Sequence, residues 1–317
     1  MNFTSKTLAA LTLSMVSAVA SATPLSDYNL ILFGDLAAVG NVHVDGRAFI
    51  GGNFTNGTDF ANHLDASYNT QDTLEVGGNI NITNLSVSKG YLAHGGTITG
   101  NVNCNGAGLS GGACVRTATG LDAKAADLYT QLKSESDYYA GLVDSLGSGL
   151  SGDNNNKSFV YTGAATDLAV FSISAADLFA VGGWNIALGN AQNAVINVTG
   201  SLVNQAGKSM NMNINQSLFD NILWNFNQAT NINFLNQWNG SVLAVDAEID
   251  TRNNFNGSVA AQRYVGSGEF HLGNPSYHWT YTPPTPPTPP TKVPEPSLLI
   301  LLLTGLGLLS LGRLRRR

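Results

Sequence analysis

The chain has 317 residues, of which 43% are hydrophobic and only 11% are charged. This composition supports one sizeable core and excludes a disordered protein and a large helical bundle. The leader and the last five residues hold 5 of the 15 basic residues, so the remainder has 10 basic against 21 acidic residues and a net charge near -11. That balance argues against nucleic acid and anionic membrane surfaces as partners and leaves neutral glycans or calcium.

Residues 1–22 are predicted to form a signal peptide. Lys6 precedes an apolar stretch from 8 to 19, and Ala20-Ser21-Ala22 follows the small-x-small rule of signal peptidase. We expect cleavage after Ala22, so that Thr23 begins the mature chain. The alternative, an N-terminal membrane anchor, is disfavoured because hydroxyl residues interrupt a stretch that is already short for a bilayer span.

Short β-type segments punctuated by glycine and asparagine make up the body. Apolar and polar residues alternate in many of them, including Leu243, Val245, Ala247 and Ile249, which places one row of side chains inward and the other outward. We predict a mainly β fold, a right-handed β-solenoid-like domain over 23–281, irregular because we find no repeat of fixed length. A β-sandwich is the alternative. The predicted strands are Asn41–Phe54, Thr73–Val87, Thr97–Cys104, Ala194–Val203, Met210–Ile214, Ile232–Phe234, Ser241–Ile249 and Gly257–Leu272.

Four titratable residues, Asp27, Asp35, His43 and Asp45, lie close together near the expected mature N-terminus. A carboxylate pair there could hold Ca²⁺ or serve acid–base catalysis. Asp35 and Asp45 each adjoin a glycine, however, and aspartate at such turns ordinarily caps backbone N–H groups. Turn capping is therefore the preferred interpretation, with calcium as the alternative cofactor and no metal site assigned.

The chain has two cysteines, Cys104 and Cys114, in a glycine-rich stretch. In an oxidising compartment their spacing predicts a disulfide that closes a local loop and contributes about 2 to 3 kcal/mol. Two unpaired thiols are the alternative.

One segment has helical rather than strand periodicity. Residues 122–146 carry an apolar stripe at three-to-four spacing, with Asp122 as the expected N-cap and Gly147 as the stop. We predict one long amphipathic helix packed along the flank of the β body. The stripe consists of Leu128, Leu132, Tyr139, Leu142 and Leu146.

A polysaccharide-cleaving β-helix enzyme is the main catalytic alternative. The ten basic residues of the body are dispersed, and the sequence presents no catalytic residue set that we can assign. Ice binding would need rows of regularly spaced Thr-x-Thr, and Thr97-Ile98-Thr99 is the one such triplet within the predicted strands. Among the tryptophans, Trp238 has polar neighbours and is the single candidate for a stacking contact with a glycan.

The C-terminal end has three consecutive parts. A Pro- and Thr-rich linker at 282–292 predicts a stiff polyproline II spacer. An apolar run at 297–312 follows, and it is short for a permanent membrane span. These parts, with the Pro-Glu-Pro triplet before the run and the arginines after it, resemble the PEP-CTERM sorting signal, which implies transient retention in the inner membrane of a Gram-negative bacterium and recognition by an exosortase. The residues that carry the resemblance are Pro294, Glu295, Pro296, Arg313, Arg315, Arg316 and Arg317.

The body also resembles a known family. The stretches 28–36 and 42–53 are similar to the opening of the choice-of-anchor A domain, and 222–226, 240–244, 256–259 and 266–271 are similar to its closing half. That family joins one extracellular domain to interchangeable C-terminal anchors, so a PEP-CTERM tail is an expected partner for it. Its implied architecture, short strands with one flanking helix, is also similar to that of bacterial ice-binding solenoids.

Together these features predict a non-catalytic surface or extracellular-matrix protein associated with exopolysaccharide or adhesion. The expected organisation is a signal peptide at 1–22, a β-rich domain at 23–281, a linker at 282–292 and a sorting signal at 293–317. The expected partners are an exosortase and a glycan, and the alternative function is a carbohydrate-active β-helix enzyme.

Overall fold

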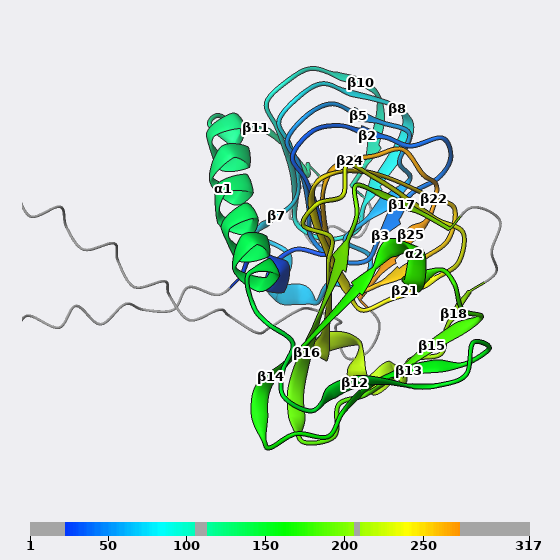
Figure 1. The fold of residues 1–317 in the computed structure, drawn as a ribbon. Coiled ribbons are helices and arrows are strands. Elements are labelled where there is room, and N and C mark those ends of the chain that lie inside the picture. Colours follow the sequence, from blue (N-terminus) through cyan, green and yellow to red (C-terminus); the bar gives the residue numbers. More distant parts are fainter. Residues whose placement is uncertain (1–22, 105–112, 206–209, 273–317) are drawn as a thin grey trace, which may run out of the picture. The chain divides into compact units, whose positions relative to one another are not determined.

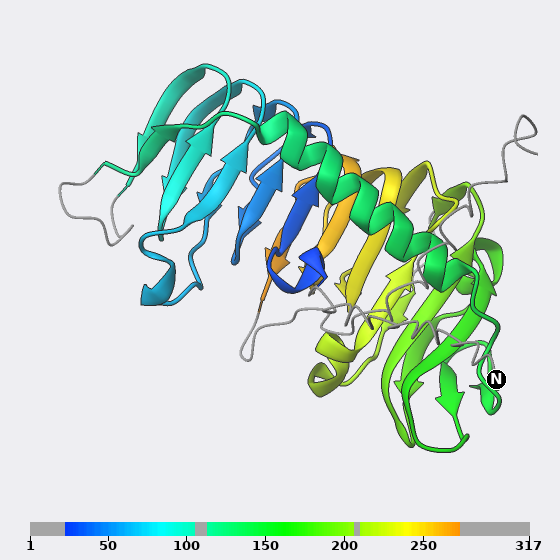
Figure 2. The same ribbon diagram turned by 90° about the vertical axis from the view of Figure 1, so that its left-hand side faces the viewer.

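The computed structural model describes residues 23–104, 113–205 and 210–272. They lie within one compact unit, Ser21–Pro283. Its strands stack into a β-solenoid with three faces, and one long helix, α1 (Leu121–Ala140), lies along the stack (Figures 1 and 2). Among the described strands every pairing is parallel except that of β12 with β13. The predicted mainly β solenoid is confirmed, and the sandwich alternative is wrong because its sheets would be antiparallel.

The first face, called the helix face, lies under α1. Its hydrogen-bonded order is continuous from one end of the stack to the other. In that order it contains β11 (Val115–Thr117), β9 (Tyr91–His94), β7 (Asp72–Val76), β4 (Ala48–Ile50), β1 (Leu30–Leu32), β24 (Val259–Tyr264), β22 (Ser241–Thr251), β19 (Ile222–Asn225), β16 (Ala191–Thr199) and β14 (Thr166–Ser174).

The second face, called the open face, follows the first around a corner, and the long strands β8, β22 and β24 continue around corners of the coil. The open face contains β10 (Ile98–Asn103), β8 (Ile80–Val87), β5 (Phe54–Thr55), β2 (Leu36–Ala37), the ends of β24 and β22, β20 (Asn231–Phe234) and β17 (Leu202–Asn204). The third face adds β6 (Asp59–Phe60), β3 (His43–Val44), β25 (Glu269–His271), β23 (Phe255–Asn256) and β21 (Trp238–Asn239).

A small separate sheet and several short helices complete the described unit. The sheet has the order β12 (Ser148–Gly152), β13 (Lys157–Tyr161), β15 (Gly183–Ala187) and β18 (Asn211–Met212). The short helices are η1 (Pro24–Ser26), η2 (Ala66–Tyr68), α2 (Ala175–Leu178) and η3 (Gln216–Asn221).

The order of the coils in space differs from their order in the chain. Strand β1 pairs with β4 on one side and with β24 on the other, so Leu30 is in register with both Ala48 and Val259. The first half of the chain therefore stacks away from the centre toward β11, and α1 returns along the stack. The second half then stacks back from β14 to β24 (Figure 2). We call the junction of β1, β2 and β3 with β24 and β25 the seam.

The interior of the coils differs between these halves. The N-terminal half is filled mainly by leucine, isoleucine and valine, with Phe54 and Phe60 as its aromatic pair. The C-terminal half holds a block of stacked rings, in which Trp184 lies 4.4 Å from Phe159 and Trp238 lies 3.9 Å from Phe234 between ring centroids. Such rings bury a large area and pack with defined geometry, so they hold the interior of this half together.

Helix α1 buries a second apolar cluster against the helix face. Leu132 and Tyr139 are fully buried there, over strand residues such as Phe49 and Leu243. Polar contacts fix the helix in place: Ser136 Oγ donates to Asn225 Oδ1 at 2.6 Å, and Asn197 Nδ2 donates to the Tyr139 carbonyl at 2.8 Å. The prediction of a helix packed on the flank is confirmed.

The predicted limits of that helix are wrong at its C-terminal end. The helix begins at Leu121 with Gly120 as its N-cap, so Asp122 lies in the first turn and is not the cap. It ends at Ala140, and Leu146 is 96% exposed. The reason is tertiary, because the chain leaves the helix so that the Ser145 N–H can donate to the Val170 carbonyl of β14.

The alternation predicted for 241–249 is only half right. Ala247 and Ile249 point into the solenoid, but Leu243 and Val245 belong to the cluster under α1. The pairing of β22 with β24 shifts register between Ala244 and Glu248, where the strand turns a corner. At the corner, the side of the strand that faces the interior of the solenoid changes. Before the corner, α1 covers the outward side. Leu243 and Val245 are therefore buried under the helix, whereas Ala247 and Ile249 are buried in the interior.

Candidate functional site

A ladder of side-chain caps joins four coils at the corner between the helix face and the open face. Asp35 Oδ1 accepts from the Asn53 N–H at 2.7 Å, and Asn53 Oδ1 accepts from the Asn79 N–H at 3.0 Å. Asn79 Oδ1 in turn accepts from the Thr97 N–H and hydroxyl, both at 2.9 Å. Because each side chain satisfies a backbone donor of the next coil, the ladder sets the stacking register of these coils.

Glycine pairs precede the ladder and let the coils approach. A Cβ atom on Gly77 would lie 2.3 Å from the Gly51 carbonyl oxygen, and one on Gly95 would lie 2.5 Å from that of Gly77. No larger residue fits between backbones at this distance. The sequence carries the signal as Gly-Gly before Asn53, Asn79 and Thr97. This signal does not recur at a fixed period, because the ladder spacings are 18, 26 and 18 residues.

Beside the ladder, the open face presents two parallel rows of outward side chains. The first row is the ladder itself, Asp35, Asn53, Asn79 and Thr97. The second row is held in register by β2, β5, β8 and β10. It consists of Ala37, Thr55, Asn81 and Thr99.

Two cavities lie on this part of the surface. A groove of about 360 Å³ runs between the rows and is lined by the first three residues of each. A neighbouring hollow of about 430 Å³ is lined by glycines and by Val39, Asn41, Asn56, Thr58, Thr83 and Asn84. Asp35 is the one charged side chain among the residues that line the two cavities. The face therefore offers amide and hydroxyl groups to a partner and very little charge.

Across the seam the same face has a different character. Arg263 forms an ion pair with Glu248 at 2.7 Å, and Asp250 follows in the outward row. Leu202, at the end of the stack, is 68% exposed. Charged side chains thus interrupt both rows just across the seam, whereas Asp35 is the one charged residue of the rows in the N-terminal half.

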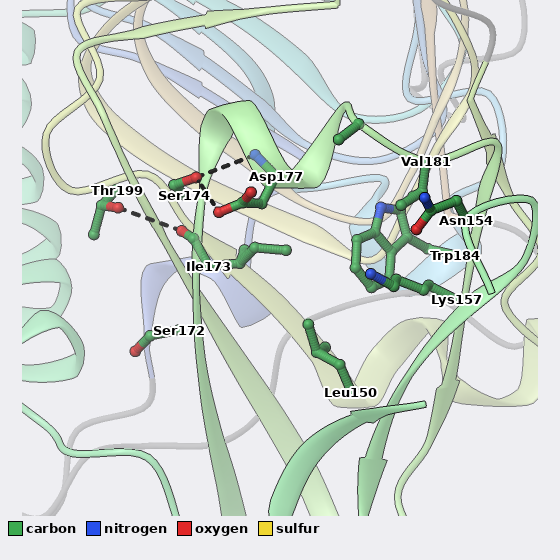
Figure 3. A pocket seen from close by; sticks show the side chains of 11 residues that line it. Leu150, Asn154, Lys157, Ser172, Ile173, Ser174, Asp177, Val181, Trp184 and Thr199 are labelled. Carbon is green, nitrogen blue, oxygen red and sulfur yellow. Dashed lines mark hydrogen bonds between the residues drawn. The ribbon is translucent and has the colours of Figure 1, made fainter. Parts of the chain in front are cut away.

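A third cavity, about 610 Å³, lies toward the other end of the solenoid beside α2 (Figure 3). Ser174 caps α2, since the Asp177 N–H donates to Ser174 Oγ at 3.1 Å, and Thr199 Oγ1 donates to the Ile173 carbonyl (Figure 3). Leu150, Val181 and Trp184 add an apolar part, but Trp184 is fully buried and offers no ring face to a ligand. Three of the six polar side chains that line the cavity, Ser174, Asp177 and Thr199, already form hydrogen bonds within the local fold.

The predicted group near the mature N-terminus is not assembled into one site. Asp35 belongs to the ladder, whereas Asp45 lies at a different corner, between β3 and β4, and accepts from the Leu272 N–H at 3.1 Å. Both carboxylates cap backbone N–H groups, as the turn interpretation expects. His43 Nε2 lies 3.2 Å from Thr58 Oγ1. Within 23–104, 113–205 and 210–272 no group of three or more His, Cys, Asp or Glu is arranged to hold a metal ion.

Asp45 instead takes part in a charged cluster across the seam. Its Oδ2 lies 2.9 Å from His63 Nδ1 and 3.4 Å from His271 Nδ1. Burial opposes ionisation of Asp45, but hydrogen bonds from His271 and the Leu272 N–H outweigh it, so its pKa lies below the usual value. The hydrogen bond to Asp45 raises the pKa of His271 against the effect of burial, and Glu269, 3.2 Å from His271 Nε2, adds to the rise.

A second titratable cluster lies under the start of α1. The buried Glu75 accepts from Tyr28 OH and from Lys124 Nζ, both at 2.6 Å, and lies 3.5 Å from Arg47. Burial first, and then the charge of Glu75, raise the pKa of the Tyr28 hydroxyl well above its usual range. None of these residues lines the three cavities above. The cluster ties the helix to the stack and offers no cavity for a substrate.

The assignment of Trp238 as a glycan contact is wrong. Its side chain is 1% exposed because it is stacked on Phe234 and packed edge-on against Trp224, inside the C-terminal aromatic block. Its polar neighbour Asn239 lies on the other side of the strand and is itself buried, donating to the Met212 carbonyl at 2.9 Å, so the polar sequence gives no sign of the buried ring. Trp279 lies outside the described residues.

The remaining predicted residues are at or beyond the ends of the described unit. The structure joins Cys104 and Cys114 in a disulfide. Thr23 is 2% exposed, and its hydroxyl donates to Glu135 of α1 at 2.8 Å. Ala20, Ala22 and the whole tail, including Pro294, Glu295, Pro296 and the terminal arginines, lie outside the described residues. In the part of the chain that is described, no helix is long and apolar enough to cross a membrane.

Comparison with known proteins gives one family and several similar folds. The similar solved structures include three of ice-binding proteins. That of the Antarctic ascomycete Antarctomyces psychrotrophicus is 11% identical, with 78% of this chain and 94% of that chain covered and a TM-score of 0.30. One from an Antarctic biological consortium is 14% identical (83% and 95%, TM-score 0.27), and one from Shewanella frigidimarina is 12% identical (78% and 94%, TM-score 0.29).

Among curated proteins, none matches the sequence. The model of a family described as "Putative Ice-binding-like adhesive domain" matches residues 21–272, which is most of the chain and all of the described solenoid. The chain therefore belongs to this family of ice-binding-like adhesive domains.

Proposed function

We propose that this protein is a non-catalytic surface or extracellular-matrix protein that adheres to exopolysaccharide through the open face of its solenoid. The observation that carries the proposal is the uncharged polar surface of the N-terminal half, where amide and hydroxyl groups repeat from coil to coil. Neutral polysaccharides present hydroxyl groups at every sugar and no charge, so this surface matches them in chemistry. Membership of an adhesive-domain family supports a non-enzymatic surface protein.

Export and sorting belong to the same proposal. The signal peptide at 1–22 would direct export, and the tail at 293–317, with its resemblance to the PEP-CTERM signal, would be held in the inner membrane and recognised by an exosortase of a Gram-negative host. The resemblance of the body to the choice-of-anchor A domain supports this pairing of one extracellular domain with a sorting tail.

Ice binding is the alternative that the family description suggests. A flat ice-binding face would carry the same short hydroxyl side chains on coil after coil. Among the described coils of the open face, only that of β10 presents Thr-x-Thr, as Thr97 just before the strand and Thr99 within it. The equivalent pairs on the other described coils are Asp35/Ala37, Asn53/Thr55, Asn79/Asn81, Arg263/Val265, Glu248/Asp250, Asn231/Asn233 and Leu202/Asn204. This variation favours a glycan over an ice plane.

The test is a pull-down of exopolysaccharide from the producing host with purified residues 23–281, which contain both apolar clusters of the compact unit. We expect retention of a neutral polysaccharide fraction and no inhibition of ice recrystallisation by the same preparation. Inhibition of ice growth without glycan retention would overturn the proposal in favour of ice binding. Cleavage of a polysaccharide would restore the enzyme alternative.

Sorting is tested separately by deleting residues 293–317. We expect the solenoid to remain folded and to escape from the cell envelope into the medium, since the linker at 282–292 separates the tail from the domain. Retention of the deleted form at the envelope would show that the tail is not the sorting element.

A further inference from the structure

The groove on the open face runs along the stacking axis of the coils, and this direction limits how a ligand can lie in it. Its two walls repeat once per coil, because β2, β5 and β8 are neighbours in one parallel sheet. Neighbouring strands lie about 4.8 Å apart, so equivalent side chains recur at that interval along the stacking axis. An extended chain of pyranose rings advances by a similar length per sugar. A glycan that lies along the axis would therefore meet the same pair of positions at each ring.

We infer that this groove binds one strand of a neutral, extended β-linked polysaccharide, aligned with the stacking axis between the first and second rows. The inference rests on the proposed function and deepens it by naming the site, the ligand class and the orientation. Three coils line the groove, and Thr97 and Thr99 continue both rows onto a fourth coil.

The hydrogen-bonding groups suit such a ligand. The Oδ1 atoms of Asp35, Asn53 and Asn79 each accept a hydrogen bond from a backbone N–H group of the next coil, so the ladder is held in place before any ligand binds. Among the described residues, the Asn81 amide and the Thr99 hydroxyl have no hydrogen-bond partner in the protein, and both side chains are exposed. Ala37 and the methyl group of Thr55 add a small apolar surface for the C–H face of a sugar ring.

Charge selects against acidic glycans. Asp35 is the one charged side chain that lines the groove, and it is negative. A carboxylate accepts hydrogen bonds from sugar hydroxyls but repels a uronate, and no lysine or arginine lines the groove to offset that repulsion. The ligand class is therefore neutral.

No aromatic ring lines the groove, so each sugar contributes a weak contact. Affinity must then come from several rings bound at once. It should rise with oligosaccharide length until the rows are filled and level off after that, because additional rings meet no further pair of positions.

The experiment titrates residues 23–281 with cello-oligosaccharides of two to six glucose units, and with oligomannuronate of equal length, by isothermal calorimetry. We expect affinity to rise with length and level off at about four units, one for each coil, with much weaker binding of oligomannuronate.

The blocking variant is Asn81→Arg, which fills the groove, and we expect it to weaken binding of the longest cello-oligosaccharide by about tenfold or more. The matched control is Asn233→Arg, at the equivalent outward position of β20 in the C-terminal half. It should bind as the unchanged protein does, and thermal unfolding of both variants checks that the fold is retained.

The outcomes separate the inference from the function on which it rests. If Asn81→Arg binds normally, or if Asn233→Arg is the weaker variant, the site is elsewhere and the inference is wrong, while glycan adhesion stands. Equal binding of oligomannuronate, or affinity independent of length, would also overturn it. If no cello-oligosaccharide binds but the exopolysaccharide pull-down succeeds, the ligand class named here is wrong. Failure of both experiments removes the proposed function as well.

Discussion

The two halves of the solenoid keep their coils in register by different means. In the N-terminal half, the ladder from Asp35 to Thr97 and the glycines beside it lock adjacent turns at the rim. In the C-terminal half the turns vary, and a block of rings around Trp224 and Trp238 holds them from inside. In the N-terminal half, the first row alone sets the register of the coils. The second row, two residues further along each strand, is therefore not needed to hold the coils together. That row is where the candidate glycan groove lies.

The largest expected effect comes from breaking the aromatic block. Trp238→Ala should lower the free energy of unfolding by about 3 to 5 kcal/mol, because it leaves a cavity between Phe234 and Trp224. Trp238→Phe should cost much less, since the indole Nε1 has no hydrogen-bond partner in the described part of the chain. Urea unfolding followed by circular dichroism measures both. Leu146→Ala, at a 96% exposed position, is the control and should change little. A loss below about 1 kcal/mol for Trp238→Ala would show that the rings do not hold this half.

The next largest effect is expected from the glycines beside the ladder in the N-terminal half. Gly77→Ala should cost about 1 to 3 kcal/mol, because the new methyl group would lie 2.3 Å from a backbone oxygen that cannot move without shifting its coil. Gly149→Ala is the matched control, as no atom lies within 4 Å of a Cβ built there. Thermal unfolding of the two variants compares them directly. Equal stability would mean that the coils can separate at the corner at little cost.

A smaller loss of stability should distinguish the first row of the open face from the second. Asn79→Ala removes the acceptor for two hydrogen bonds from Thr97 and should cost about 1 kcal/mol. Asn81→Ala, two residues along the same strand, should be close to neutral, and Asn79→Asp should retain most of the stability because a carboxylate oxygen can accept the same bonds. If Asn81→Ala is the more damaging substitution, the assignment of structure to the first row and binding to the second is wrong.

The smallest effect concerns pH at the seam. Because the pKa of His271 is raised in the folded protein, the protonated side chain stabilises the fold. This contribution to the free energy of unfolding is complete below the pKa of the unfolded chain, about 6.5, and is lost as pH rises through the pKa of the folded protein. The lowered pKa of Asp45 means that its contribution is complete above about 3.9 and is lost as pH falls through the folded value. Stability from this pair should therefore be greatest between about pH 4 and 6.5. Denaturant unfolding against pH tests this. His271→Gln should remove the alkaline decline and reduce the acid one, because His271 supplies one of the hydrogen bonds that lower the pKa of Asp45.

Much of the architecture could be predicted because it is written in local patterns. Alternating short strands with glycine and asparagine turns are typical of stacked coils, and the 3.6-residue stripe around Leu132 is typical of a flanking helix. Strands β12 to β15 escaped prediction, since Ser148–Gly152 is rich in glycine and serine and owes its strand conformation to pairing with β13. Tertiary pairing there overrides weak local preference.

The candidate site was harder to predict than the fold. Asp35 was singled out as a turn residue, but its partner Asn53 is 18 positions away, and the next step of the ladder spans 26. The longer step contains the loop around η2, which hides the repeat from a search at one period. The burial of Trp238 is hidden for a different reason: on a short strand its polar neighbours Gln237 and Asn239 lie on the opposite side, and they say nothing about the inward ring.

The position of β1 in the middle of the stack has a consequence for how the protein is made. One neighbour, β4, is close in sequence, because Leu30 is in register with Ala48. The other neighbour, β24, is distant in sequence, because Leu30 is also in register with Val259. Of the described strands, the first to emerge during synthesis therefore waits for the last but one before both of its edges are hydrogen-bonded. Such distant pairings make folding slow, because a long stretch of chain must be ordered before the contact forms. A chain truncated before β24 should leave β1 and β22 with open edges, the state in which parallel strands recruit other chains and aggregate.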